Sequence, residues 1–355
     1  MSLDYTKLEK RWAEFWNKEN EDRPIMSVFA PKKVTKPEDF QKHQDYRDAW
    51  LDVEYQIKHA RNSFENTHFL GEALPVFSPN LGPDFLGALC GCDLKFGADT
   101  SWSIPCITDY ESFPPIKFDE NNKWWKKMCE LTLAALEDSH GDYLVGITDL
   151  HAGADGLVSL RGPENAALDI YDEPEQFKAR VNEIFPVFKE VTFRLHNMIS
   201  AYQKGCINWM GILRTEELWY PTSCDFSCMI SPDCFEEFII PELLEEIEML
   251  PASIYHLDGP GALKHLDRLL KIEKLNGIQW VYGAGQPSAR YWIKELKKIQ
   301  EAGKCIQVEC KPEDIVPICE NLRPQGVNLI CCVDDLESGE AIIKEAERVC
   351  RAKRG

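Results

Sequence analysis

The chain has 355 residues, 44% of them hydrophobic and 28% charged, and a formal net charge of −19. The acidic balance argues against nucleic acid as a partner, because phosphate binding requires clustered Lys and Arg. No apolar run approaches the roughly 20 residues that cross a bilayer, and the N-terminus lacks a signal-peptide hydrophobic region. We therefore expect a cytoplasmic protein without a membrane segment, long enough for a substantial buried core.

The N-terminal third of the chain predicts a helix, two strands and a long loop. Residues 1–22 have apolar side chains at helical spacing and predict a surface helix packed on the body. Strands are predicted at 25–29 and 73–77, with a charged helical stretch over 37–62 between them. Residues 95–122 are rich in Pro and aromatic residues, and we expect an irregular loop insertion there rather than a separate domain.

Beyond residue 122, predicted helices and strands alternate. The strands are short and apolar throughout, which is typical of a parallel sheet buried on both faces. Ser231-Pro232 is a helix start, with an N-cap residue followed by Pro at the first helical position. The predicted strands are 143–147, 207–212, 254–257, 278–281, 305–309 and 327–332, and the predicted helices are 123–139, 174–203, 231–250, 262–272, 288–302, 312–321 and 339–351.

Eight strands that mostly alternate with helices predict an α/β fold, an elaborated (β/α)8 TIM barrel with an N-terminal helical extension, forming a single domain over residues 1–355. A doubly wound open sheet is the alternative. No GxGxxG or GxxxxGK[ST] motif follows a strand, so a nucleotide-binding sheet lacks its fingerprint.

The stretch 253–261, with the sequence SIYHLDGPG, is the strongest candidate site. His256 and Asp258 are two residues apart, so on an extended segment both side chains point the same way. In a barrel the chemistry gathers at the C-terminal ends of the strands. Other polar, aromatic or sulfur side chains predicted at or just after strand ends are Asp149, His151, Trp209, Asp225, Ser227, Gln279, Trp280, Cys310 and Cys332.

Two interpretations of these strand ends remain open. In the first, His256, Asp258 and Cys310 or Cys332 hold a zinc ion, which accepts such a mixture of N, O and S ligands and keeps one position open for catalysis. In the second, a metal-free polar pocket uses Asp225, His256, Asp258 and His151 to bind and protonate a small substrate. Asp149, Trp209, Ser227, Gln279 and Trp280 would then contact that substrate. The chain has 14 cysteines but no CxxC…CxxC framework, and each alone is compatible with simple core packing.

Three segments resemble the uroporphyrinogen decarboxylase superfamily, which includes the corrinoid-dependent methyltransferases and is related to cobalamin-independent methionine synthase. They are LVGITDLHAGADGLVSLRGPENAALDIYDEPEQF, DFSCMISPDCFEEFIIPELLEEI and the strand into HLDGPG. The resemblance runs from about Pro24 to the end of the chain and implies a (β/α)8 barrel. The decarboxylases carry Arg-Gln-Ala-Gly-Arg after the first strand to bind substrate carboxylates. Residues 25–33 contain no arginine, which disfavours a porphyrinogen substrate.

The methyltransferase branch of this superfamily holds zinc with a His-x-Cys after the fifth strand and a distant Cys near the eighth, so that a zinc-bound thiolate attacks a methyl group. By resemblance, His256 matches the histidine, Asp258 stands at the first cysteine, Cys331 or Cys332 falls near the second, and Gln279 is near the place of a glutamate ligand.

The resemblance thus implies a methyltransferase that moves a methyl group between a small methylated compound and a corrinoid protein or a thiol. Its catalytic residues would be His256, Asp258 and Asp225, with zinc as a cofactor and a corrinoid carried by a partner protein. A decarboxylase of a small acid and a non-catalytic binding protein are the alternatives. Dimers occur in the superfamily, so a homodimer is compatible with the resemblance.

Overall fold

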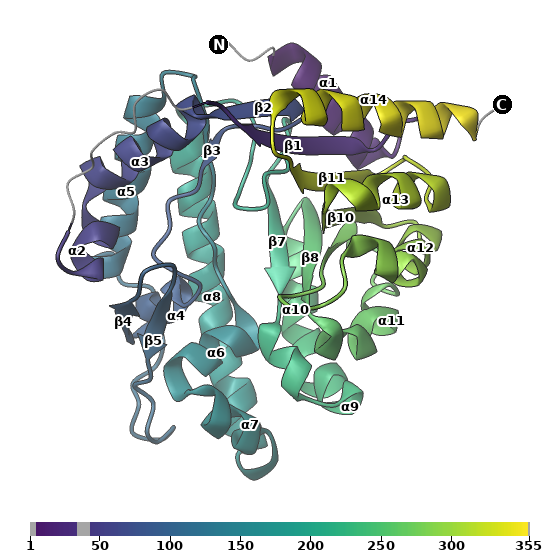
Figure 1. Cartoon of the computed structure of the whole chain (residues 1–355). Coiled ribbons are helices and arrows are strands. Elements are labelled where there is room, and N and C mark those ends of the chain that lie inside the picture. Colours follow the sequence, from purple (N-terminus) through teal and green to yellow (C-terminus); the bar gives the residue numbers. More distant parts are fainter. Residues whose placement is uncertain (1–4, 34–42, 354–355) are drawn as a thin grey trace.

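The computed structural model describes residues 5–33 and 43–353 and has a mixed α/β architecture around a central, mostly parallel sheet (Figure 1). Seven strands form this sheet in the order β2-β1-β11-β10-β9-β8-β7. All neighbours are parallel except β2, which runs antiparallel to β1. The strands are β1 (Ile25–Pro31), β2 (Thr67–Gly71), β7 (Trp219–Ser223), β8 (Ala252–Asp258), β9 (Gly277–Val281), β10 (Cys305–Cys310) and β11 (Val327–Cys332).

Two short parallel pairings lie outside the seven-stranded sheet. β3 (Val76–Phe77) pairs in parallel with β6 (Leu144–Val145), and a single parallel bridge joins Ile147 to Asn208. Within residues 5–33 and 43–353, no strand pairing joins β3 to β1 or Asn208 to β7. The sheet is therefore not closed by hydrogen bonds, and the predicted eight-stranded barrel is reduced to an open, mostly parallel sheet.

The two edges of the sheet explain why it stays open. The antiparallel strand β2 occupies the free edge of β1, so β3 cannot pair there. At the other end, β7 is an edge strand containing Pro221, which has no N–H to donate to a further strand. The fourth strand predicted at 207–212 is reduced to the single bridge at Asn208, and the chain then turns back so that Cys206 pairs with Arg214.

The helices after residue 122 follow the predicted alternation with strands. In Figure 1, α11 to α14 lie along one side of the sheet, and α2, α3 and α5 lie on the far left. No helix in the part of the chain that the structure describes is long and apolar enough to cross a membrane. The helices are α1 (Tyr5–Asn17), α2 (Tyr46–Leu51), α3 (Val53–Glu65), α4 (Phe85–Cys90), α5 (Lys123–Ser139), α6 (Gly153–Arg161), α7 (Pro163–Asp172), α8 (Pro174–Ser200), α9 (Pro232–Cys234), α10 (Ile240–Met249), α11 (Leu266–Leu269), α12 (Ile293–Glu301), α13 (Ile315–Asn321) and α14 (Leu336–Ala352).

The N-terminal helix α1 covers the starts of the parallel strands. Trp16 lies edge to face against Trp219, the first residue of β7, at 5.2 Å between ring centroids. The carbonyl of Phe15 accepts a hydrogen bond from the thiol of Cys305, the first residue of β10. Trp12 and Phe15 are buried in this contact. Because α1 covers these starts, the C-terminal ends of the strands are left for the site.

Three predicted segments agree with the structure only in part. The helix expected over residues 1–22 is confirmed over Tyr5–Asn17, and residues 1–4 lie outside the described part. The stretch 37–62 contains α2 and α3, while residues 34–42 are also outside it. The insertion at 95–122 opens with a β-hairpin, β4 (Asp93–Phe96) and β5 (Ser101–Ile104), and is otherwise irregular.

Candidate functional site

Three residues predicted for the site meet at the C-terminal ends of β7 and β8. His256 and Asp258 are the fifth and last residues of β8, so the strand directs both to the same face. Asp225 begins a short 3₁₀ segment, Asp225–Met229, two residues after β7 ends. One ligand atom from each of these three side chains lies within 4.8 Å of the others. We call these residues the β8 cluster.

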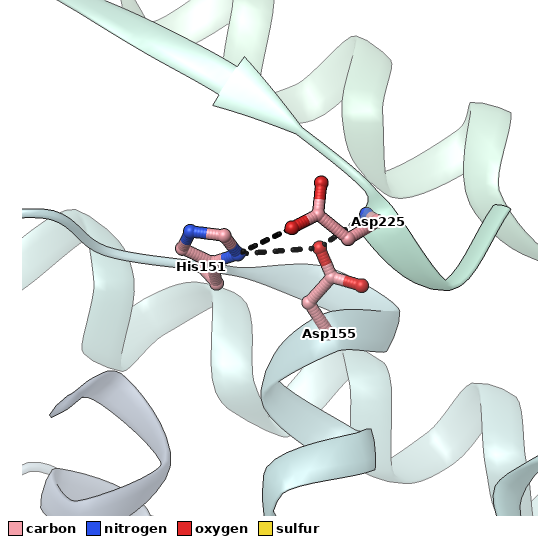
Figure 2. Close-up of side chains that lie close together, drawn as sticks. All are labelled: His151, Asp155 and Asp225. Atoms are coloured by element: carbon pink, nitrogen blue, oxygen red, sulfur yellow. Dashed lines mark hydrogen bonds and ion pairs between the residues drawn. The ribbon is translucent and has the colours of Figure 1, made fainter. Parts of the chain in front are cut away.

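A second group shares Asp225 and is drawn in Figure 2. His151 comes from the loop between β6 and α6, and Asp155 lies in the first turn of α6. The Nδ1 atom of His151 is 3.5 Å from an oxygen of Asp155 and 3.8 Å from one of Asp225. Its Nε2 is 3.0 Å from Asp149. His151 is thus surrounded by three carboxylates.

These carboxylates determine the charge of His151. Burial alone lowers the pKa of the ring, but Asp149, Asp155 and Asp225 together raise that pKa well above its usual value. Both ring nitrogens face carboxylate oxygens. We infer that the protonated form of His151 is favoured here, where it balances part of the surrounding negative charge.

Asp155 has a structural task as well. Its two carboxylate oxygens accept hydrogen bonds from the backbone N–H groups of Asp225, at 2.7 Å, and Phe226, at 2.8 Å. These bonds tie the N-terminus of α6 to the 3₁₀ segment after β7 and so fix where Asp225 begins.

His256 has a different set of partners, a row of three buried amides on three neighbouring strands. Its Nδ1 contacts Oε1 of Gln279 on β9. The Gln279 amide N–H donates to Gln307 on β10 at 2.6 Å, and the Gln307 amide N–H donates to Asn328 on β11 at 2.8 Å. Asn328 in turn donates to the hydroxyl of Ser27 on β1 at 3.2 Å. We call Gln279, Gln307 and Asn328 the amide row.

Backbone carbonyls fix the direction of this row. The Gln307 amide nitrogen also donates to the carbonyl of Met210 at 3.0 Å, and a carbonyl oxygen can only accept. The oxygen of Gln307 must therefore receive the N–H of Gln279, which turns the oxygen of Gln279 toward His256. It follows that Nδ1 of His256 carries the hydrogen and that Nε2 is left to bind. Histidines that bind metals are usually held this way by their other nitrogen.

Asp225 lies in an unfavourable electrostatic position. Removal from water and the neighbouring Asp155 raise its pKa to about 6, against the opposing effect of His151 and His256. Its Oδ1 is buried and has no hydrogen-bond partner among the described residues. A cation would relieve both conditions. One nitrogen and two carboxylates from the β8 cluster suit a divalent ion such as zinc, with a coordination position left open.

Four other predicted residues are not gathered into this site. Cys310 is buried and its thiol donates to the carbonyl of Val308, while Cys332 is exposed at the end of β11, and neither belongs to the two groups above. Trp280 follows Gln279 on β9 and so lies on the opposite face, edge to face with Trp292. The carbonyl of Ser227 accepts a hydrogen bond from His265, which anchors the 3₁₀ segment. Trp209, by contrast, does contact the cluster, with its ring centroid 5.3 Å from that of His256.

A buried acid pair on α10 was missed by the sequence analysis. Glu242 and Glu246 are hydrogen-bonded to each other, and burial raises the pKa of Glu242 to about 7. Burial and the Glu242 charge raise the pKa of Glu246 well above its usual value. The signal was present in the sequence: two acids four residues apart on the helix face that also carries Leu243 and Ile247. Asp155 could similarly have been found four residues after His151.

Comparisons with known proteins bear on the fold. No protein-family model matches the sequence, and no curated protein matches it either. Among solved structures, a methyltransferase from Methanosarcina mazei is similar with a TM-score of 0.63 and 12% identity, over 96% of this chain and 98% of that one. At this identity the likeness shows the fold alone. A glycoside hydrolase family 5 enzyme from Prevotella bryantii B14 has a TM-score of 0.35 and 8% identity, over 93% of this chain and 97% of that one, and carries no argument.

Proposed function

We propose that this protein is a methyltransferase on an opened (β/α)8 barrel, moving a methyl group between a small methylated compound and a corrinoid protein or a thiol. The observation that carries the proposal is the convergence of Asp225, His256 and Asp258 at the C-terminal ends of β7 and β8. The structural likeness to the Methanosarcina mazei methyltransferase and the resemblance of the HLDGPG stretch to the methyltransferase branch support it.

The β8 cluster would hold a zinc ion through Nε2 of His256 and through the carboxylates of Asp225 and Asp258. When bound, zinc lowers the pKa of a ligated thiol or polarises a ligated oxygen. Two carboxylates neutralise the charge of the ion, and oxygen ligands make the site harder than one built from cysteines. Gln279 holds the His256 ring in place, and protonated His151 limits the repulsion between Asp225 and Asp155.

Metal content tests the zinc site. We expect about one zinc per chain in the wild-type protein purified from zinc-supplemented cultures, and its loss in His256→Ala. Cys332→Ser is the matched control and should keep its zinc, because Cys332 is exposed and outside the β8 cluster. Zinc loss in Cys332→Ser, or no zinc in the wild type, would contradict the proposed ligand set.

Methyl transfer itself is tested with free methylcobalamin and 2-mercaptoethanol under anaerobic conditions. The thiolate sulfur takes the methyl group, the electron pair of the cobalt–carbon bond stays on cobalt, and the change to cob(I)alamin is followed in the visible spectrum. We expect the wild-type protein to accelerate this change and His256→Ala to do so at least about tenfold less. A wild-type rate equal to that of thiol alone would count against methyl transfer to a thiol.

A further inference from the structure

A cavity of about 320 Å³ lies where the sheet is open, between the pair β1–β2 and the short strand β3. Its walls come from β1, β2, α3, β3, β11 and the turn that carries Trp209 and Met210. Trp209 is the link to the site already described, because its ring lines the cavity and also touches the ring of His256. The volume is at the small end of the range for ligand pockets.

The walls of this cavity are aromatic and uncharged. Phe69 meets Phe29 at 5.8 Å and Phe64 at 6.1 Å between ring centroids, and all three line the cavity together with Trp209. None of the lining side chains is ionisable. An ion placed against these walls would lose part of its hydration without gaining a counter-charge, which is unfavourable. The walls therefore favour a neutral ligand.

The polar side chains of the cavity are Ser27, Ser63, Thr67 and Trp209, and the indole N–H of Trp209 has no hydrogen-bond partner among the described residues. Thr67 already donates its hydroxyl hydrogen to the carbonyl of Ser63. The oxygen of Ser27 accepts from Asn328 at the end of the amide row, so the hydrogen of the Ser27 hydroxyl is left for another acceptor. A ligand oxygen near β1 would fill that role. The cavity thus offers aromatic walls and uncharged donors, among them the hydroxyl of Ser27 on β1.

Aromatic side chains also bind quaternary ammonium ions, and this alternative can be weighed from the walls. Phe29 and Phe69 meet at an interplanar angle of 79° and Phe64 and Phe69 at 63°, so in each pair the edge of one ring covers a face of the other. The carboxylates that would assist a cation, Asp225 and Asp258, are not among the lining residues. The neutral ligand is the better fit.

We propose that this cavity binds a neutral aromatic ether, such as the methyl ether of a phenol, with the ring between Phe29, Phe64, Phe69 and Trp209 and the ether oxygen accepting from Ser27. That such a ligand is the methyl-bearing substrate rests on the proposed function. The binding of the ligand does not, because none of the lining residues belongs to the β8 cluster.

Calorimetric titration of the full-length protein with methoxybenzene tests the ligand class, with benzoate and tetramethylammonium as charged probes of similar size. We expect saturable one-site binding of methoxybenzene and weaker binding of both ions. Tighter binding of tetramethylammonium or of benzoate would overturn the proposal, as would the absence of methoxybenzene binding.

A variant that fills the cavity locates the site. Ser63 is exposed on α3 and lines the cavity, so Ser63→Trp can place an indole in it without altering the core. Glu65→Trp is the control, since Glu65 is exposed on the same helix but does not line the cavity. We expect Ser63→Trp to weaken methoxybenzene binding by about tenfold or more through steric exclusion, and Glu65→Trp to bind as the wild type does. Equal binding in both variants would place methoxybenzene elsewhere.

His256→Ala separates this proposal from the proposed function. It should still bind methoxybenzene, because Trp209 and the phenylalanines remain in place. If binding is intact while the wild type catalyses no methyl transfer, the cavity stands and the function is wrong. If methyl transfer is observed and methoxybenzene does not bind, the function stands and the cavity has another ligand.

Discussion

His151 and His256 lie near the same carboxylate, Asp225, and differ in what their remaining partners are. His151 faces carboxylates through both ring nitrogens, whereas His256 donates from Nδ1 to an amide oxygen whose orientation is fixed from β10. One ring therefore favours its protonated form, and the other presents a free nitrogen. The difference depends on contacts between residues far apart in the sequence, so a single histidine and its neighbours cannot reveal it.

The buried acid pair on α10 predicts a pH dependence of stability. Burial raises the pKa of Glu242 from its usual 4.5 to about 7, so the folded chain holds this proton more tightly than the unfolded chain does. The contribution of Glu242 to the free energy of unfolding is fully present below about pH 4.5 and is lost as the pH rises through about 7.

Glu242→Gln cannot ionise, so the variant avoids the loss of stability with rising pH. Its amide oxygen can still accept the hydrogen bond from Glu246. We expect the variant to match the wild type at about pH 5.5 more closely than at about pH 8, where it should be more stable by up to about 3 kcal/mol. Urea unfolding at the two pH values measures this difference. Glu248→Gln, at an exposed position on the same helix, is the control and should show no such trend. A Glu242→Gln variant less stable than the wild type at the higher pH would contradict the sign.

Among single residues, the sequence indicated part of the side-chain cluster that the structure shows. His256, Asp258 and Asp225 were found because strand ends and the residues just after them can be recognised from local patterns, and the structure brings the three together. Cys310 and Cys332 were also expected at strand ends, but the local pattern does not say which way a terminal side chain points. Trp280 illustrates the same limit, because one residue along a strand reverses the face.

Among the elements, the amide row predicts an effect at a distance. Gln307 does not appear among the contacts of His256, yet it fixes the orientation of Gln279. In Gln307→Met the oxygen and the amide nitrogen are both lost, so the amide of Gln279 becomes free to rotate. We expect the ring of His256 to change from one tautomer to a mixture, which the ¹³C and ¹⁵N chemical shifts of the imidazole report.

Gln307→Glu is the matched control for this experiment. A carboxylate still accepts the N–H of Gln279, so the tautomer of His256 should be retained even if stability falls. If both variants keep a single tautomer, or both lose it, the row does not control the ring.

Helix α5 offers a simpler test of an element boundary. The side-chain oxygen of Asn122 caps this helix by accepting from Trp124 N–H at 2.8 Å, and its amide nitrogen donates to the carbonyl of Ala88 at the end of α4. Asn122→Ala should lower the free energy of unfolding by about 1–2 kcal/mol, measured by urea denaturation. Asn122→Asp keeps the cap but not the bond to α4 and should lie between the two. A loss below about 0.3 kcal/mol in Asn122→Ala would show that the cap is dispensable.

The helix α5 itself was predicted with the bounds that the structure has, whereas β7 was not predicted at all. The helix has a local start signal and apolar residues at regular spacing. β7 contains Pro221 and follows a charged stretch, which locally indicates a loop, and it becomes a strand because β8 pairs with it. The open edges of the sheet likewise depend on which strands pair, and these strands are far apart in the sequence.

Across the described residues, one hydrophobic core extends from Leu8 in α1 to Cys350 in α14. Phe15 is fully buried in it, and Phe15→Ala should cost about 3–5 kcal/mol. If the chain is one domain, urea midpoints from tryptophan fluorescence and from circular dichroism should shift together. Lys10→Ala, at an exposed position on α1, should shift neither. A fluorescence midpoint that moves alone would mean that α1 unfolds separately.

The amide row also has a consequence for how this protein can change over evolutionary time. Each amide is oriented by the next, so exchanging one of them for an apolar residue leaves a buried donor or acceptor unpaired in its neighbour. Single exchanges are therefore disfavoured, and Gln279, Gln307 and Asn328 should be inherited as a block. Lineages that replace His256 have no further use for that block, and there the three positions are free to become apolar together.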